Sequence, residues 1–473
     1  MTGKVRDMGR KVAVVGGGAA GMMAAVQAAY AGARVTVYER NDRVGKKILS
    51  TGNGKCNFSN EDMRATCYYG SGAGYVDGFY KQFGVAETKT FFRELGMRIK
   101  DRNGYLYPAS EQAATVLDVL RYEMERLGIE ICAGCRVTGI DSTENPAKKR
   151  EADASPARKK EADGSEGTVA GATDNAGYRL MLETETAAYK KRTYDAVILA
   201  CGGRAAPKTG SDGTGLAMAK RLGHRIVPTV PALTALRCGE TFWKQVAGVR
   251  CEARLMLYID GNAVSSVQGE LQLTDYGISG IPVFQFSRIA AYALQEGRPV
   301  TVKIDLMPDH GAADIQEAFW VRRWERQKRQ SMEQFVTGTV NKKVGLLLLK
   351  LAGIRETETV CEIEGARRRK LEQLFHVFEV TVKGTNSFEQ AQVCAGGVDF
   401  AEVTDRLESV RRPGLFFAGE MLDIDGICGG YNLQWAWSSG AVAGRAAAGK
   451  AEFCPKKSRR PDVAHKMPDG KDM

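Results

Sequence analysis

The run KVAVVGGGAAGMMAAVQAAYAGARVTVYE, residues 11–39, decides the fold class. An apolar segment from Lys11 to Val15 is followed by a glycine-rich turn, an alanine-rich helical segment over 19–31, and a second apolar segment from Arg34 to Glu39. This order predicts strand, turn, helix and strand. It is the first βαβ unit of a doubly wound α/β fold.

The glycine turn satisfies the pattern G-x-G-x-x-G and lies between a predicted strand and a predicted helix. Gly16 permits a tight turn, Gly18 allows a pyrophosphate to approach the backbone, and Gly21 lets the helix pack closely on the strand. The first N–H groups of the helix are free to bind that anion. Glu39 is placed to hydrogen-bond the ribose hydroxyls of an adenosine. The sequence therefore predicts a dinucleotide site, and this acidic residue fits either NAD or FAD.

Three later segments, 45–57, 200–215 and 419–434, favour FAD. Each is rich in glycine and small polar residues that could wrap a pyrophosphate or a flavin ring. A helix predicted to begin at Tyr431 could place its N-terminus against the flavin and stabilise the anionic reduced ring. The expected cofactor-binding residues are Gly16, Gly18, Ala19, Ala20, Gly21, Glu39, Arg40, Lys46, Lys47, Thr51, Gly52, Asn53, Gly54, Cys56, Asn57, Val137, Ala200, Gly202, Gly203, Gly419, Glu420, Asp423, Gly430, Tyr431, Asn432, Leu433 and Gln434.

Composition places the chain among globular proteins. Of its 473 residues, 44% are hydrophobic and 26% charged, which excludes a wholly disordered or collagen-like chain and indicates two or three domains. The 11 cysteines are scattered and odd in number, which favours a reducing cytoplasm. No run approaches the ~20 apolar residues that span a bilayer, and the four histidines show no metal-ligand spacing. We therefore expect a cytoplasmic protein without a membrane span or a metal site.

Changes of pattern along the chain predict its domains. We expect an α/β, Rossmann-like FAD-binding domain in two segments, 1–205 and 375–450, with an insert at 206–374. The insert is expected to be β-rich over about 225–305 and helical over about 310–374. Helices are also predicted over 79–95 and 111–127. The charged stretch 141–177 is expected to be a disordered loop between two strands, and 451–473 a disordered basic tail.

Four segments carry a resemblance to a known family. They are the run from Val12 to Asn60, GELQLTDYGISG at 269–280, AQVCAGGV at 391–398, and FFAGEMLDIDGICGGYNLQWAWSSGAVAG at 416–444. Together they resemble the BaiN-like NAD(P)/FAD-dependent flavoproteins, which are distantly similar to succinate dehydrogenase and fumarate reductase flavoproteins. The resemblance implies a two-lobed flavoprotein with a split FAD domain. It also implies reduction of conjugated C=C bonds of the kind found in 3-oxo bile-acid intermediates.

Reduction of an activated C=C bond needs a hydride donor and a group that supplies a proton or polarises the carbonyl. Tyr276 is the first candidate for that group. The alternative is that Tyr276 is only a buried aromatic side chain beside a turn. Tyr431 is the second candidate, unless it only shapes the flavin pocket. Cys132 and Cys135 have the spacing of a redox-active disulfide, but they precede a strand expected near the adenine end, so we expect neither a disulfide nor electron transfer there.

Two questions about partners stay open at this level. No second G-x-G-x-x-G follows a strand, so NAD(P)H, if it is the reductant, would bind transiently over the flavin. The net charge of +11 arises from three stretches, 322–329, 367–370 and 456–473, which fit solvated helix faces and a tail.

The leading hypothesis is an NAD(P)H-driven, FAD-dependent reductase of a small hydrophobic or anionic molecule, with no stable nucleic-acid partner. A flavoprotein that acts on or binds RNA, and a flavin-binding protein without turnover, are the alternatives. The oligomeric state is left open.

Overall fold

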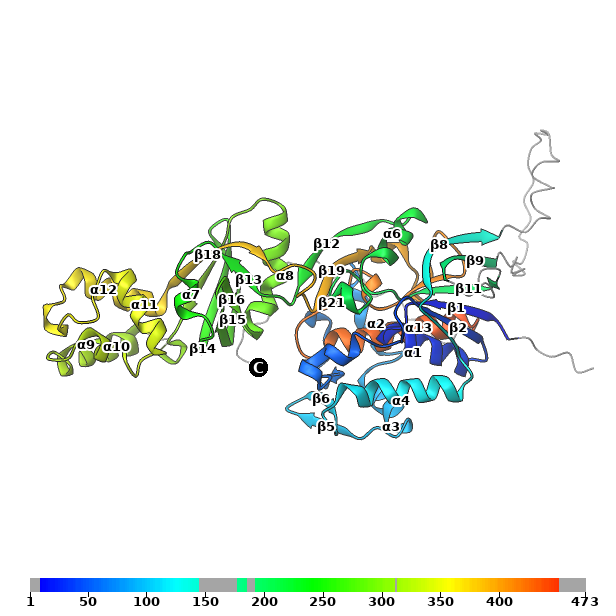
Figure 1. The fold of residues 1–473 in the computed structure, drawn as a ribbon, viewed down its shortest axis with the longest axis horizontal. Helices are drawn as coiled ribbons and strands as arrows, with labels where there is room; N and C mark the ends of the chain where they lie inside the picture. The colour runs from blue at the N-terminus through cyan, green and yellow to red at the C-terminus, as the bar shows by residue number, and fades with distance from the viewer. Residues whose placement is uncertain (1–8, 144–176, 185–191, 311–312, 451–473) are drawn as a thin grey trace, which may run out of the picture.

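A sheet of five parallel strands organises the fold. The computed structural model describes residues 9–143, 177–184, 192–310 and 313–450. The strand order is β20 (Leu415–Phe417), β11 (Ala196–Leu199), β1 (Lys11–Val15), β2 (Arg34–Glu39) and β7 (Glu130–Ala133), and each neighbouring pair is parallel. Strands from both ends of the chain share this sheet, which confirms the predicted Rossmann-like fold in two sequence segments (Figure 1).

Helix α1 (Ala19–Tyr30) and the closing helix α13 (Tyr431–Ala447) pack tightly against each other. A Cβ atom at Gly440 would lie 2.5 Å from the carbonyl oxygen of Ala20, and one at Gly444 would lie 2.3 Å from that of Ala24. Both distances are far inside van der Waals contact, so only glycine permits this approach. The contact ties the first helix of the chain to the last.

The remaining elements of the Rossmann lobe surround this sheet and helix pair. They are α2 (Val76–Tyr80), α3 (Val85–Glu94), α4 (Ala113–Arg126), α6 (Thr214–Arg221), the sheet of β3 (Ser59–Asn60), β6 (Tyr105–Pro108) and β5 (Ile99–Arg102), the sheet of β10 (Thr193–Tyr194), β9 (Gly177–Glu183) and β8 (Arg136–Thr143), and the pair of β4 (Tyr68–Tyr69) and β21 (Asp425–Gly426). The helix predicted over 79–95 is divided into α2 and α3, because the backbone is extended at Gly84, which caps α3. The helix predicted over 111–127 is α4.

The β-rich part of the insert is a closed antiparallel barrel. Its strands, in order, are β13 (Leu236–Cys238), β16 (Gly277–Ser279), β15 (Asn262–Leu273), β14 (Arg250–Ile259), β17 (Val300–Asp305) and β18 (Phe378–Thr385), with the short helix α7 (Trp243–Val246) beside them. Two strands, β12 (Ile226–Ala232) and β19 (Val393–Val398), pair outside the barrel. Because β18 closes the barrel, the chain returns to the Rossmann lobe later than the predicted boundary at 375.

Helix α8 (Ile281–Gln295) was not predicted, since the whole of 225–305 was expected to be strands and turns. It packs on β12, β14, β15 and β18, and Phe286 and Ala290 are fully buried in the barrel core. In Figure 1 it lies between the barrel and the Rossmann lobe.

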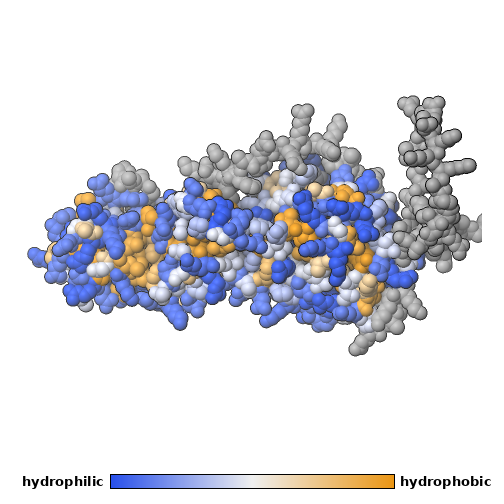
Figure 2. All heavy atoms as spheres, turned by 90° about the horizontal axis from the view of Figure 1, so that it is seen from above, coloured by the Kyte–Doolittle hydropathy of each residue, from blue (hydrophilic) through white to orange (hydrophobic). Residues whose placement is uncertain are grey.

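The helical part of the insert comprises α9 (Ala313–Arg326), α10 (Met332–Val336), α11 (Lys342–Ala352) and α12 (Gly365–His376). Trp320, Phe335 and Phe375 join it to the barrel in one buried cluster. The helices lie at the end of the molecule away from the Rossmann sheet (Figure 1). Figure 2 shows many hydrophilic residues over this end, with a hydrophobic area between them. The exposed basic residues of the helical part include Arg322, Arg326, Arg329, Arg369 and Lys370.

Two predicted segments, the charged loop and the basic tail, fall largely outside the described residues. The tail at 451–473 and most of the predicted loop, 144–176, lie outside the described residues. In the part of the chain that is described, no helix is long and apolar enough to cross a membrane. The same residues hold no cluster of His, Cys, Asp or Glu side chains that could bind a metal ion.

Candidate functional site

A deep cavity lies along the carboxyl ends of β1, β2, β11 and β20, where doubly wound folds bind their ligands. The space between its walls, counting its opening to solvent, is about 1260 Å³. The predicted residues that line it are Gly16, Gly18, Ala19, Ala20, Glu39, Arg40, Lys46, Lys47, Thr51, Val137, Ala200, Gly202, Gly419, Glu420, Asn432 and Leu433. Residues from both sequence segments thus meet in one cavity.

The three glycines of the first turn have different surroundings. Gly16 has φ +101°, and a Cβ there would lie 2.5 Å from the carbonyl oxygen of Ala200. A Cβ at Gly21 would lie 1.9 Å from the carbonyl oxygen of Gly16, so turn and helix are in direct contact. Gly18 is the N-cap residue of α1, and a Cβ there would meet no atom within 4 Å. The backbone at Gly18 is therefore open to the cavity at the helix N-terminus.

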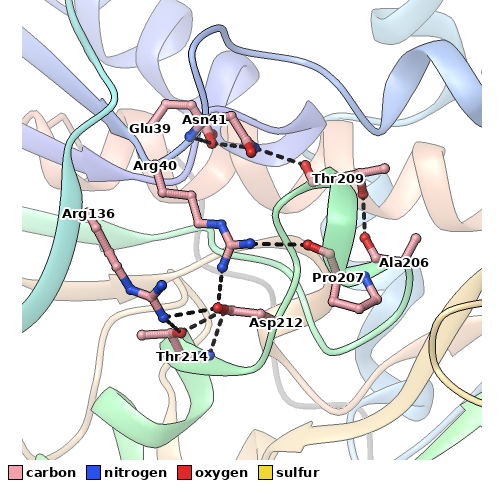
Figure 3. A network of polar contacts seen from close by, with 9 residues as sticks. All are labelled: Glu39, Arg40, Asn41, Arg136, Ala206, Pro207, Thr209, Asp212 and Thr214. Atoms are coloured by element: carbon pink, nitrogen blue, oxygen red, sulfur yellow. Dashed lines mark hydrogen bonds and ion pairs between the residues drawn. The ribbon is translucent and has the colours of Figure 1, made fainter.

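The carboxylate of Glu39 is buried and held by backbone and amide N–H groups. Its Oε2 accepts a hydrogen bond from the N–H of Gly17 at 2.8 Å. Its Oε1 accepts from the backbone N–H and from Nδ2 of Asn41, both at 2.8 Å. Figure 3 shows Asn41 also donating to the carbonyl of Thr209, at 3.1 Å. Each carboxylate oxygen has two lone pairs, so Glu39 can still accept from a hydroxyl group of a ligand.

A second polar cluster lies beside Glu39 (Figure 3). Asp212 forms ion pairs with Arg40 and, at 3.1 Å, with Arg136, which also donates to Thr214 Oγ1 at 3.0 Å. Burial opposes ionisation of Asp212, but hydrogen bonds from Thr214 and the two guanidinium groups hold its pKa below the usual value. The cluster joins three separate stretches of chain and fixes this end of the cavity.

The other end of the cavity is built around Glu420 and the start of α13. Lys47 donates to Glu420 Oε2 at 2.9 Å, and the N–H of Cys394 donates to Oε1 at 2.9 Å. The side chain of Asn432 accepts from the N–H of Gly426 and donates to its carbonyl, both at 2.8 Å. Asn432 therefore fixes the turn that precedes α13, whose N-terminal residues face the cavity.

Several predicted residues do not line the cavity. They are Gly21, Gly52, Asn53, Gly54, Cys56, Asn57, Gly203, Asp423, Gly430, Tyr431 and Gln434. Gln434 is fully buried and bonds to Ser59, Thr88 and Ser438, so its contacts are internal to the fold. Cys56 is also buried, and burial raises its pKa to about 12.

The two candidate catalytic tyrosines also lie away from the cavity lining. Tyr431 is 5% exposed, and its carbonyl accepts a hydrogen bond from Tyr68. Tyr276 lies in the barrel lobe, where its hydroxyl accepts from Nδ2 of buried Asn386 at 2.9 Å and the guanidinium of Arg237 lies 5.1 Å from the ring centroid. Because Tyr276 accepts in that bond, its own proton is available to another group.

The expectation that Cys132 and Cys135 are unbonded was wrong, since the structure joins them in a disulfide. Cys132 lies opposite Tyr38 on the edge strand β7, and the N–H of Cys135 donates to the carbonyl of Glu39 at 2.9 Å. A turn at Gly134, with φ +67°, brings the two cysteines together. Cys135 lines the cavity at the Glu39 end.

Sequence reasoning missed one ionic contact between the lobes. Nε of Arg288, on α8, donates to Oδ1 of buried Asp425 at 2.9 Å. Burial raises the pKa of Asp425 from 3.8 to about 6, and Arg288 opposes that shift. The neighbouring Asp423 was singled out from the sequence, but nothing local in the sequence indicates that Arg288 meets this loop.

Comparisons with known proteins agree with this architecture. The model of the HI0933-like protein Rossmann domain matches residues 10–161 and 165–446. The 3-dehydro-bile acid delta(4,6)-reductase of Clostridium scindens is 40% identical over 441 residues, which cover 93% of this chain and 99% of that protein. The ribosomal RNA dihydrouridine synthase of Haemophilus influenzae is 27% identical over 432 residues, 90% of this chain and 95% of that protein.

Two solved structures show a more distant similarity, at low sequence identity. An open conformation of a flavocytochrome c3 fumarate reductase is 16% identical with a TM-score of 0.41, and the match covers 93% of this chain and 78% of that one. A 3-ketosteroid-delta4-(5alpha)-dehydrogenase from Rhodococcus jostii is 14% identical with a TM-score of 0.43, covering 94% and 98%.

Proposed function

Since the chain belongs to the family of HI0933-like proteins with a Rossmann domain, we propose that it is an FAD-dependent oxidoreductase that reduces a C=C bond conjugated to a carbonyl group. The observation that carries this proposal is the 40% identity, over 99% of its length, to a relative named as a 3-dehydro-bile acid delta(4,6)-reductase. The substrate class is therefore a small hydrophobic or anionic enone, of which 3-oxo steroids and bile acids are examples.

The chemistry of the cavity fits FAD. The N-terminus of α1, with an open backbone at Gly18, would hold the pyrophosphate, and Glu39 would bind the ribose hydroxyls. Lys47, Thr51 and Leu433, at the other end of the cavity, would border the flavin ring. When bound, FAD supplies hydride transfer, and the protein supplies position and electrostatics.

The chain's own groups would complete the reaction. We assign the proton donor to Tyr276, whose hydroxyl proton is not used in its bond with Asn386. Tyr431 would shape the pocket from behind the lining, since it is 5% exposed. NAD(P)H would act as a transient reductant over the flavin. A cytoplasmic location is part of this proposal, and it is supported by the eight free cysteines among the described residues.

A second candidate function is reduction of uridine in RNA. Two relatives are named as ribosomal RNA dihydrouridine synthases, one at 27% and one, from Escherichia coli, at 26% identity. The uracil double bond that is saturated in dihydrouridine is also conjugated to a carbonyl, so the chemistry at the flavin would be the same. The exposed basic residues of the helical part, such as Arg322 and Arg369, would suit a polyanion.

Anaerobic half-reactions test these proposals. The yellow holoprotein is mixed with NADH or NADPH, and bleaching of the flavin is followed. The reduced protein is then mixed with an enoate, an enone, a 3-oxo-4-ene steroid, or a uridine-containing RNA at two salt concentrations. Reoxidation by the steroid or enone supports the first function, whereas reoxidation by RNA that weakens with salt supports the second. A flavin that no acceptor reoxidises indicates binding without turnover, and protein that binds no FAD refutes both functions.

A further inference from the structure

Arg288 connects the barrel lobe to the loop that precedes α13. It lies on α8, and its Nε donates to Oδ1 of Asp425 on β21 at 2.9 Å. The guanidinium carbon lies 5.1 Å from the ring centroid of Tyr69 and 4.9 Å from that of Tyr292. One carboxylate and two aromatic rings from both lobes therefore hold this cation in a fixed position.

The terminal nitrogens of Arg288 are unused in this arrangement. A guanidinium has five N–H donors. Among the described residues, the Nη atoms of Arg288 are not counted with the buried polar atoms that lack a partner, so they are accessible to a ligand or to water. Within the described residues, the contact with Asp425 is the hydrogen bond that Arg288 makes, although its side chain is only 18% exposed. Both Nη atoms therefore remain to bind an oxygen acceptor from a ligand.

The segment that carries Asp425 borders the dinucleotide cavity, although Arg288 itself is not among the residues that line it. Ile424, the residue before Asp425, lines that cavity, and so does Val393. Val393 belongs to a small apolar cluster against which Tyr292 packs. One turn earlier on α8, Gln285 accepts a hydrogen bond from the N–H of Cys428 at 3.0 Å. The same face of α8 thus presents polar groups to the loop at 425–428.

Negative charge around Arg288 keeps it in place. Asp425 is 3% exposed in its side chain, and Asp423, also buried, has an Oδ1 atom without a hydrogen-bond partner among the described residues. Glu420 lies on the same segment but is paired with Lys47. Burial raises the pKa of Asp425 to about 6, so this acid can change its charge near neutral pH.

We propose that Arg288 binds the carbonyl oxygen of the substrate and stabilises the enolate formed during reduction, with Asp425 as its positioning residue. This inference rests on the proposed function. A hydride from the reduced cofactor forms a C–H bond at the β-carbon, and the electrons of the C=C bond move onto the carbonyl oxygen. The N–H groups of Arg288 would stabilise that oxygen, and the α-carbon would then accept a proton from the hydroxyl of Tyr276, the donor proposed above. The substrate gains two electrons, and the cofactor loses them.

Three variants separate this role from a structural one. Arg288→Gln removes the charge, and Arg288→Lys keeps it but has fewer donors in another geometry. The matched control is Arg298→Gln, because Arg298 follows α8, is 45% exposed in its side chain and pairs with Asp260 at 2.7 Å. All three are checked for FAD content and thermal melting before they are compared.

Two measurements on the holoprotein carry the test. Protein reduced with dithionite is mixed with 4-androstene-3,17-dione, so the rate of flavin reoxidation does not depend on NAD(P)H. We expect Arg288→Gln to be about 100-fold slower than wild type, Arg288→Lys to lie between them, and Arg298→Gln to be unchanged. In the second measurement, oxidised protein is titrated with the same steroid, and Arg288→Gln should raise the Kd by about 10-fold or more.

The outcomes distinguish this inference from the proposed function. Unchanged binding and reoxidation in Arg288→Gln overturn the role of Arg288, while turnover by wild type preserves the function. Binding that depends on Arg288 without turnover supports the site and refutes the function. Wild-type protein that neither binds nor is reoxidised by the steroid or a uridine oligonucleotide overturns the site. Asp425→Asn adds a pH readout: the reoxidation rate of wild type should change near pH 6, and that change should be absent in the variant.

Discussion

Substitution of Gly18 by alanine should weaken FAD binding without harming the fold. The backbone at Gly18 has φ −80° and ψ −169°, which alanine adopts without strain, and a Cβ there would meet no protein atom within 4 Å. We therefore expect the apoprotein to be as stable as wild type or more stable by about 0.4–1 kcal/mol. The added methyl group would keep a pyrophosphate from the N–H groups at the start of α1. Loss of one charged hydrogen bond is worth about 1.5–3 kcal/mol, or roughly 10- to 100-fold in Kd.

The matched control for this substitution is Gly21→Ala in the same turn. A Cβ at Gly21 would lie 1.9 Å from the carbonyl oxygen of Gly16, so this variant should lose stability even without cofactor, by about 1–3 kcal/mol or more. Urea unfolding of both apoproteins and titration with FAD, followed by flavin fluorescence, separate the two effects. The reasoning is refuted if Gly18→Ala binds FAD as tightly as wild type, or if both variants unfold at the same urea concentration.

Three further predictions concern other parts of the site. Glu39→Ala should leave the N–H groups of Gly17 and Asn41 without their acceptor and lower FAD affinity at least 10-fold; full FAD content after dialysis would contradict this. Because the pKa of Asp425 is raised from 3.8 to about 6 in the folded chain, its contribution to stability should be full below about pH 4 and lost as the pH rises through 6. Urea unfolding of wild type and Asp425→Asn across that range should show the decline in wild type alone. Cys132 and Cys135 should resist alkylation in the native protein until a dithiol reductant is added, as mass spectrometry would show, and rapid labelling of both would rule out the disulfide.

The parts of the fold that were predicted correctly depend on contacts between neighbouring residues. The run from Lys11 to Glu39 contains strand, turn, helix and strand in one stretch, and the observed bounds of β1 and β2 match it. The start of α13 at Tyr431 was also predicted correctly, because the preceding glycines, such as Gly430 at φ +93°, interrupt any regular element. Such signals are local, so one sequence is sufficient to show them.

The disulfide shows where local reasoning fails. The spacing of Cys132 and Cys135 was recognised, but their bonding depends on the turn at Gly134, whose N–H donates to the carbonyl of Asn41 at 2.8 Å. That contact comes from strand pairing between β2 and β7, more than ninety residues apart in sequence. The geometry that brings the sulfurs together is tertiary, and the spacing alone does not contain it.

The residues proposed to bind the cofactor and those proposed to bind the substrate also differ in how well the sequence predicts them. The residues proposed to hold FAD lie in short runs at the ends of strands and the starts of helices, so their chemistry can be recognised from sequence. Arg288 and Asp425 are 137 residues apart, and they meet only because α8 packs on the barrel with Gln285, Arg288 and Tyr292 on the face that meets the Rossmann lobe. Helical spacing of three and four residues places these side chains together. Under the role proposed for Arg288, we expect substitutions on this face of α8 to change which carbonyl compound is accepted while the dinucleotide cavity remains intact.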